Sequence, residues 1–507
     1  MPFRLSRLFH PLKLNLSSLS KTLTKLFKTP LFVTFCSATV IIGGTYVAIQ
    51  FAKGYRPALN GNLQGTGLLA ANSFPNGAQV YLNGKLVTAT DATLNLNPGE
   101  YAIEIKKDGF STWKKSLKIE KELVTQTNAV LFPAVPGLTP LTYTGATNIS
   151  SSPDGQKLVF YVASASAQIK NGLYILDLTD SLLSLKKGSR QISQETRAFN
   201  LAQTKIIWSP DSSQILLSFE GKNVVLDPNK MNALTELQDV SYKLPRLFSE
   251  WEEDVYKRER TSLAKFPDEI QQIATESAIN VYFSPDEERV IYTATVSAIL
   301  PDNILPSVPA ANSQPQERTL QPGGVYIYDR KEDRNFRVGT EDLQKYITQQ
   351  SQIPQETTKK AVKKKLSVAV PTAIVSSPKT TLTQYGKLSL ATDLYTNKIK
   401  TLIAQPLAFQ RLQGETAENS IQHFVEYYSS LYTSGIQWLP DSKHLLGLRG
   451  DTLYVKEYDG TNENTLYSGQ FNETFVYPWP NGSKIILLTR FSQAIDNPTN
   501  LYAITLR

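Results

Sequence analysis

The side chains best suited to acid–base or metal chemistry are few in this chain of 507 residues. The only cysteine, Cys36, lies within an apolar run, and the three histidines are His10, His423 and His444. A single thiol excludes a disulfide framework and a zinc site built on thiolates. Three histidines so far apart offer little for a metal centre or for a nucleophile–histidine–acid triad.

Motifs that carry known catalytic chemistry do not occur in the sequence. There is no G-x-S-x-G elbow, no phosphate-binding G-x-x-x-x-G-K-[ST] loop, no H-E-x-x-H and no Rossmann G-x-G-x-x-G pattern. We interpret His444 as a structural residue of a repeated hairpin, and His423 has no carboxylate partner that the sequence assigns. We therefore predict no catalytic, cofactor-binding or metal-ligating residue, no cofactor, and a protein that is not an enzyme.

Positive charge is concentrated at the N-terminus. The chain has a formal net charge of +8, yet residues 1–90 contain nine basic residues and no acidic one, so the rest carries −1. A nucleic-acid-binding protein is expected to hold its positive charge on a folded domain. We therefore expect no nucleic-acid partner and interpret the basic residues as a topology signal.

Residues 31–52 predict a transmembrane helix. The run contains 22 residues without a charge, and a helix of this length spans about 33 Å, enough for the hydrocarbon layer. Six basic and no acidic residues lie in the tail 1–30 before it, which places the N-terminus in the cytoplasm. The tail fits either an amphipathic helix on the inner leaflet or a disordered charged segment.

A cleaved signal peptide is the competing interpretation of the apolar run. The run is longer than the usual signal core, and Gln50-Phe51-Ala52 is a poor small-x-small cleavage site. Phe35 precedes Cys36, which also disfavours a lipoprotein site. We therefore favour an uncut anchor, with everything after about residue 53 outside the cytoplasm.

A linker over 53–65 is followed by a small β-rich domain over 66–133. Short alternating strands are separated by turn signals, of which Asn83-Gly84 predicts a type I′ hairpin and Asn97-Pro98-Gly99 another turn. Five or six antiparallel strands in about 65 residues favour a β-sandwich.

This segment resembles the PEGA domain. The naming tetrapeptide stands as Pro75-Asn76-Gly77-Ala78, with Asn76 in place of Glu, and the V-Y-L-N-G-K, L-N-P-G-E-Y and K-D-G-F-S-T-W-K segments also resemble the family. The resemblance implies an extracytoplasmic β-sandwich of prokaryotic cell-surface proteins, with similarity to surface-layer proteins.

Residues 134–507 contain a hairpin that recurs five times. Its copies are marked by a proline, at Pro153, Pro210, Pro285, Pro440 and Pro480. Each copy has a β-branched residue four positions before the proline and two aliphatic residues five and six positions after it. Proline presets φ for a tight turn, and the Asp or Asn that follows it bonds back to the backbone. The pattern predicts a strand, a turn and a second strand in every copy.

Repeated units of three or four strands indicate the blades of a β-propeller. The Ser-Pro-Asp-Gly form at 152–155 resembles the TolB-type, WD-repeat-like propellers. Allowing for insertions over 240–278, 297–322 and 340–384, the remaining length predicts about six blades, with seven as the alternative. Residues 387–402 have the pattern of outer strands of a degenerate blade.

The first insertion, 240–278, has a helical pattern, whereas 297–322 and 340–384 are expected to be loops. Apolar residues at helical spacing predict that the helix packs on the propeller rather than binds a partner. The residues expected to pack are Tyr242, Leu244, Leu247, Trp251 and Val255.

The sequence thus predicts a mainly β, single-pass membrane protein with extracytoplasmic C-terminal domains. We expect an interaction scaffold whose propeller binds an envelope protein or glycan. Two alternatives stay open: an enzyme acting on envelope polysaccharide at a site in the propeller channel, and a structural surface-layer component.

Overall fold

The computed structural model of the chain describes residues 30–53, 55–57, 63–163, 166–167, 170–179, 188–197, 199–309, 312–343, 420–422, 424–425, 435–469, 471, 475–490 and 498–507. These residues divide into two compact units. The first runs up to Ala71 and also contains Ala92–Glu100 and Lys118–Thr127. The second contains Asn72–Asp91, Tyr101–Leu117 and Asn128–Arg507.

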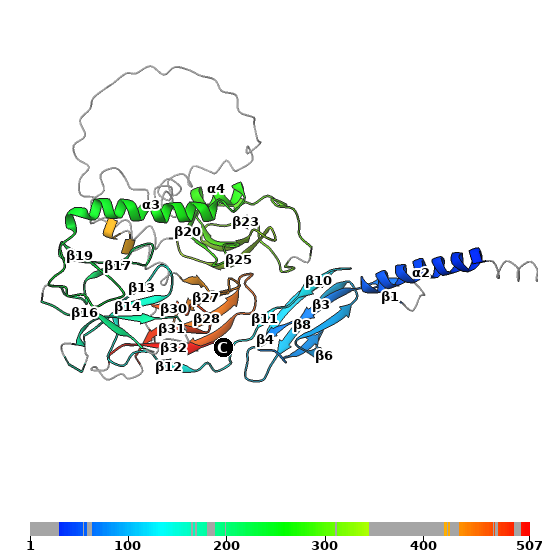
Figure 1. The fold of residues 1–507 in the computed structure, drawn as a ribbon, viewed down its shortest axis with the longest axis horizontal. Helices are drawn as coiled ribbons and strands as arrows, with labels where there is room; N and C mark the ends of the chain where they lie inside the picture. Colours follow the sequence, from blue (N-terminus) through cyan, green and yellow to red (C-terminus); the bar gives the residue numbers. More distant parts are fainter. Residues whose placement is uncertain are drawn as a thin grey trace, which may run out of the picture. The chain divides into compact units, whose positions relative to one another are not determined.

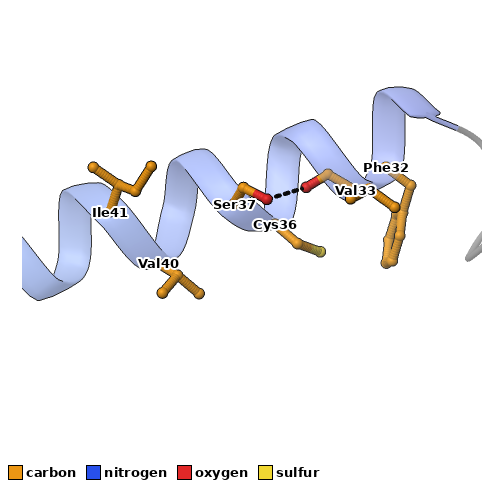
Figure 2. A pocket seen from close by; sticks show the side chains of 6 residues that line it. All are labelled: Phe32, Val33, Cys36, Ser37, Val40 and Ile41. Carbon is orange, nitrogen blue, oxygen red and sulfur yellow. Dashed lines mark hydrogen bonds between the residues drawn. The ribbon is translucent and has the colours of Figure 1, made fainter.

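Helix α2, Pro30–Ala52, belongs to the first unit, and its residues Phe32–Ala52 are long and apolar enough to cross a membrane. The side chains on the face drawn in Figure 2 are Phe32, Val33, Cys36, Ser37, Val40 and Ile41. The polar group among them is satisfied within the helix, because Ser37 Oγ donates to the carbonyl of Val33 at 2.7 Å. Backbone and hydroxyl groups paired in this way suit a helix surrounded by lipid.

The remaining strands of the first unit form two small sheets. Strands β1, Tyr55–Pro57, and β2, Leu63–Gly65, pair antiparallel within the segment predicted as a linker. The other sheet has the order β10-β3-β7 and comprises β3, Gly67–Ala71, β7, Ala92–Leu96, and β10, Val124–Gln126. Burial alternates along β3, as expected for a strand with one face in a core.

The second unit begins with a four-stranded sheet of order β6-β5-β8-β9. Its strands are β5, Gln79–Leu82, β6, Lys85–Ala89, β8, Gly99–Lys106, and β9, Trp113–Ile119. Asn83 and Gly84 join β5 to β6 with φ of 49° and 79°, which confirms the predicted type I′ hairpin. A short parallel pair joins β4, Ser73–Phe74, to β11, Ala129–Val130.

Five antiparallel sheets follow among the residues that the structure describes (Figure 1). We call them blades A to E in chain order. Blade A contains β13, Thr147–Ser151, β14, Lys157–Val162, β15, Gly172–Asp177, and β16, Arg190–Gln194. Blade B contains β17, Lys205–Trp208, β18, Ile215–Phe219, and β19, Lys222–Leu226. Blade C contains β20, Ala278–Phe283, β21, Arg289–Ala294, β24, Gly324–Asp329, and β25, Arg334–Thr340, and a separate pair is formed by β22, Ala298–Ile299, and β23, Thr319–Leu320.

Blades D and E are the last two sheets among the described residues. Blade D contains β26, Ile436–Trp438, β27, His444–Arg449, β28, Thr452–Glu457, and β29, Asn464–Ser468. Blade E contains β30, Val476–Pro478, β31, Lys484–Thr489, β32, Asn500–Thr505, and the early strand β12, Leu138–Pro140. Because β12 pairs antiparallel with β32, the beginning and the end of this region share one sheet. Such pairing of the two ends closes a propeller ring.

Buried apolar clusters join neighbouring blades around the ring. One cluster contains side chains of blades A and B, another of E and A, another of C and D, and another of D and E. Blades A, D and E therefore each contribute to clusters with two neighbouring sheets, which bury faces that a single small sheet cannot bury alone. The fold is a β-propeller, as the hairpin repeat predicts.

Helices pack on both blade B and blade C (Figure 1). They are the short 3₁₀ turn η2, Ser241–Lys243, helix α3, Leu244–Leu263, and helix α4, Asp268–Glu276. Side chains of α3 pack on Ile207 and Leu216 of blade B together with Ile421 and Phe424. Leu263 and residues of α4 pack on blade C. The helical insertion is therefore part of the ring's core.

The packing prediction for the insertion was right at four positions and wrong at one. Leu244, Trp251 and Val255 are buried and Leu247 is partly buried on blade B, but Tyr242 is 74% exposed. Tyr242 lies in η2 before α3 begins, so the helical spacing of the packed residues does not extend to it. The predicted outer strands at 387–402 and most of the 340–384 insertion lie outside the described residues.

Candidate functional site

The aspartates of the propeller hairpins accept hydrogen bonds within their own turns. Asp154 accepts hydrogen bonds from Ser152 Oγ at 2.5 Å and from the backbone N–H of Gln156 at 3.0 Å. Asp211 and Asp286 accept the same serine bond at 2.6 Å in their own hairpins. Burial alone would raise the pKa of Asp211 and Asp286, but these hydrogen bonds lower it.

At two of the five hairpins, the residue after the aspartate connects neighbouring blades. It has a left-handed φ in all five hairpins, at Gly155, Ser212, Glu287, Ser442 and Gly482. Where serine replaces glycine, its hydroxyl accepts a hydrogen bond from the neighbouring blade: Asp154 N–H donates to Ser212 Oγ and Asp286 N–H to Ser442 Oγ, both at 3.0 Å.

Helix α3 makes the corresponding connection between blades B and C. Arg258 donates to the carbonyl of Pro210 in the blade B hairpin at 3.4 Å. One turn later, Ser262 Oγ donates to Glu287 Oε1 in the blade C hairpin at 2.8 Å. Side chains of α3 thus link the hairpin of blade B to the hairpin of blade C.

His444 is a buried structural residue of blade D. Its Nδ1 lies 2.6 Å from Asp441 Oδ2, and the Phe132 ring meets its edge at a centroid distance of 5.3 Å. Burial favours a raised pKa for Asp441, but the bond and charge of His444 and the nearby backbone N–H groups outweigh it and hold the pKa at about 2. The other two histidines lie outside the described residues.

A buried ion cluster joins strand β9 to the outer turn of blade D, and all of its residues belong to the second unit. Lys115 Nζ lies 2.5 Å from both Glu457 Oε2 and Asp459 Oδ2, and all three side chains are largely buried. Trp113 Nε1 donates to the other oxygen of Glu457. Burial opposes the charge on Lys115, but the two carboxylates outweigh it and raise the pKa of its ammonium. We call these four residues the Lys115 cluster.

The loop over 297–322 also contacts β9. Asn312 Nδ2 donates to Asp459 Oδ2 at 2.8 Å, and Gln314 Nε2 donates to the carbonyl of Ser116 at 2.7 Å. On the other side, the N–H of Lys114 donates to Asn462 Oδ1 at 2.7 Å. The insertion that the sequence presents as a plain loop therefore helps to hold the four-stranded sheet on blades C and D.

Phe132 forms a second attachment of the same sheet. It is 4% exposed and packs in the core between blades D and E beside Leu439 and Leu446. Its backbone is tied to the β8–β9 connection, because Ser111 N–H donates to the Phe132 carbonyl at 2.7 Å and Ser111 Oγ accepts from Phe132 N–H at 3.0 Å. An aromatic anchor and an ion cluster together fix the sheet at two separate points.

One sequence signal identifies the Lys115 cluster in retrospect. Burial along β9 alternates, with Trp113, Leu117 and Ile119 buried. Lys115 shares their parity, so a lysine stands where the strand alternation requires an inward-facing residue. An inward-facing lysine needs a carboxylate partner, but its partners are more than 340 residues away, and the strand pattern does not name them.

Among the described residues, no group of three or more His, Cys, Asp or Glu side chains is placed to hold a metal ion. A cavity of about 210 Å³ opens between the inner strands of blades A and B. Its lining residues are Asn148, Ile149, Ser150, Ala202, Gln203, Thr204, Lys205, Ile206 and Val425. The described part of the chain thus offers structural joints and a small cavity with polar lining residues.

Comparison with known domains identifies the segment before the propeller. The sequence profile of the PEGA domain matches residues 66–134. These residues are a PEGA domain. The resemblance carried by Pro75-Asn76-Gly77-Ala78 is confirmed, and the Lys115 cluster therefore joins a PEGA strand to the propeller. A search of curated proteins gave no significant match.

Solved structures similar to the chain include two TolB proteins. TolB from Agrobacterium tumefaciens is 11% identical with a TM-score of 0.19, over 71% of this chain and 78% of that one. TolB from Acinetobacter baumannii is 10% identical with a TM-score of 0.18, over 80% and 59%. An oligogalacturonate lyase in complex with manganese is 10% identical with a TM-score of 0.18, over 87% and 91%. The propeller assignment itself comes from the strand order and blade contacts of this chain.

Proposed function

We propose that the protein is a membrane-anchored, extracytoplasmic scaffold whose propeller binds an envelope protein or polymer. The apolar helix α2 supports a membrane anchor, and the basic tail before it supports a cytoplasmic N-terminus. The PEGA domain is typical of surface proteins that work outside the cytoplasm. The described residues supply contacts that hold domains together, which favours binding over catalysis.

The observation that carries this proposal is the double attachment of the PEGA sheet to one face of the propeller. The Lys115 cluster lies at the β28–β29 turn, which is at the same end of blade D as the Pro440 hairpin. Hydrogen bonds between hairpins place the hairpins on one common face. The opposite ends of the blades, with their strand-connecting loops, are the surface left for a ligand.

Topology and binding are tested separately on the full chain, because Phe132 belongs to the propeller core and a fragment starting at 134 would lose it. Protease added to intact cells should cut within the predicted loop over 340–384 while a tag at the N-terminus survives. Full protection of the ectodomain, with an active cytosolic reporter fused to the C-terminus, would overturn the orientation. The detergent-solubilised protein should retain an envelope protein or polymer from fractionated envelopes, and no retained component would contradict the scaffold proposal.

A further inference from the structure

The cavity between blades A and B lies where the inner strands β13 and β17 begin. Its lining from blade A is Asn148–Ser150, and from blade B the segment 202–206. The Pro153 and Pro210 hairpins follow the other ends of these two strands, and the hairpin face carries the PEGA sheet. The cavity is therefore on the propeller face that the PEGA attachment leaves open.

The cavity is held in shape by an asparagine in a β-bulge. Asn148 has a left-handed φ of 47°, and the pairing of β13 with β14 shifts register next to it. Its amide donates to the carbonyls of Leu201 at 2.8 Å and Thr204 at 2.7 Å, which fixes the blade B loop against blade A. Bulges and left-handed residues of this kind often lie beside binding sites.

The chemistry of the lining is that of a hydroxylated, anionic ligand. Lys205 is the cationic residue of the lining, and among the described residues it forms no ion pair. Ser150 and Gln203 add a hydroxyl and an amide. The cavity is smaller than the roughly 300–1,000 Å³ of drug-sized pockets, so it admits a single small ring or group.

Blade C provides an internal comparison, because Asn280 stands at the position equivalent to Asn148. It also lies in a bulge with a left-handed φ of 52°. In blade C, a carboxylate of the chain itself binds to this asparagine. Glu341 Oε2 accepts hydrogen bonds from Asn280 Nδ2 at 2.9 Å and from Thr293 Oγ1 at 3.0 Å. In blade A the corresponding Glu195 is held instead by the Tyr161 hydroxyl at 2.6 Å, and a cavity with a lysine remains.

We infer that this cavity binds one acidic sugar unit, with the anionic group on Lys205 and the sugar hydroxyls on Ser150 and Gln203. The inference rests on the proposed function and deepens it, because it names the polymer class as an acidic glycan of the envelope. The anionic group is a carboxylate or a phosphate, and the two are separated by the choice of probe.

Titration calorimetry of the full chain in detergent micelles tests the inference with three probes: D-glucuronate, glucose 6-phosphate and glucose. We expect saturable binding of at least one anionic probe and none of glucose. Loss of one charge-assisted hydrogen bond is worth about 1.5–3 kcal/mol, so Lys205→Gln should weaken that binding about tenfold or more. The control is Lys222→Gln, an exposed lysine of the same blade, which should bind as the wild type does.

Thermal unfolding is the control for folding. If Lys205→Gln unfolds at the same temperature as the wild type, its weaker binding does not result from a loss of folding. Glucuronate binding assigns a carboxylate, and glucose 6-phosphate binding a phosphate. Absence of saturation by both anions, equal binding by Lys205→Gln, or equal binding of glucose would overturn the inference. If the sugar-binding test fails while the topology and envelope-retention tests succeed, the scaffold proposal is kept and the proposed sugar site is rejected.

Discussion

At the scale of single residues, this molecule uses charge for attachment. Lys115, Glu457 and Asp459 are taken out of water together, and their mutual attraction repays a desolvation cost that none of them could meet alone. Within blade D, the Asp441 carboxylate is likewise paired, with the ring of the buried His444 at 2.6 Å. Removing one member should therefore cost more than an exposed ion pair is worth.

Lys115→Ala should lower the free energy of unfolding by about 3–5 kcal/mol, because it leaves two buried carboxylates without their cation. Urea unfolding of the full chain measures the change. Lys114→Ala is the matched control: Lys114 is its neighbour, is 60% exposed and pairs with Glu104 at 3.2 Å, so about 0–1 kcal/mol is expected. Equal effects of the two substitutions would contradict a buried cluster.

Asp441 should make the fold sensitive to acid. Its pKa of about 2 in the folded protein lies below its ordinary value of 3.8. This carboxylate therefore stabilises the fold above about pH 3.8, and the contribution, about 2 kcal/mol, disappears as the pH falls through about 2. Urea unfolding between pH 6 and pH 2 should show a smaller acid-induced loss in Asp441→Asn than in the wild type.

The exposed Asp451 in the same blade supplies the control for this pH series. Asp451→Asn should follow the wild-type profile at every pH. If Asp441→Asn also follows the wild-type profile, the Asp441–His444 contact does not contribute to the acid sensitivity of the fold.

At the scale of elements, α3 covers an apolar face of blade B, as a neighbouring blade would. Phe248 is fully buried, stacks on Phe424 at 5.3 Å and meets Trp251 edge-on at 5.8 Å between centroids. The hydrogen bonds of Arg258 and Ser262 then join blades B and C through the helix. A removable cap would have neither a continuous aromatic core nor links to both sides.

Phe248→Ala should destabilise the whole propeller by about 3–5 kcal/mol, because it opens a cavity in a core shared by helix and blade. Thermal unfolding reports the loss, and hydrogen exchange shows where it acts. Faster exchange should extend into β18 of blade B. Tyr256→Ala, on the exposed side of the same helix, should have little effect. Faster exchange confined to α3 would identify it as a separable cap.

At the scale of the molecule, closure depends on the pairing of β12 with β32. Thr139 lies opposite Ala503 in that pairing, and Leu138 opposite Ile504. Because the clusters at D–E and E–A both use blade E, opening this sheet should weaken the entire ring. The closure is therefore a cooperative feature rather than a local one.

Deleting residues 500–507 should abolish cooperative unfolding, because it removes the strand that pairs with both β12 and β31. Differential scanning calorimetry of the purified chain checks this. Arg507→Ala, a change at the exposed terminus, should keep a single transition. A truncated chain that retains a single sharp transition near the wild-type temperature would contradict closure through β32.

Much of this architecture can be predicted from local patterns in the sequence. The uncharged run 31–52, the Asn83-Gly84 turn and the five proline hairpins each follow from backbone preferences within a few residues. Strand alternation even marks Lys115 as an inward-facing residue. These features specify the candidate membrane-spanning helix, the PEGA domain and the repeated blades.

The tertiary structure alone decided which distant residues meet. Pairing of Lys115 with Glu457 and Asp459, and the cavity between Asn148 and Lys205, join segments that no local pattern relates. The place of α3 between two blades was equally out of reach, because an amphipathic helix reveals that it has a buried face but not what covers it. Local preferences fix elements, whereas long-range packing and charge pairing fix their neighbours.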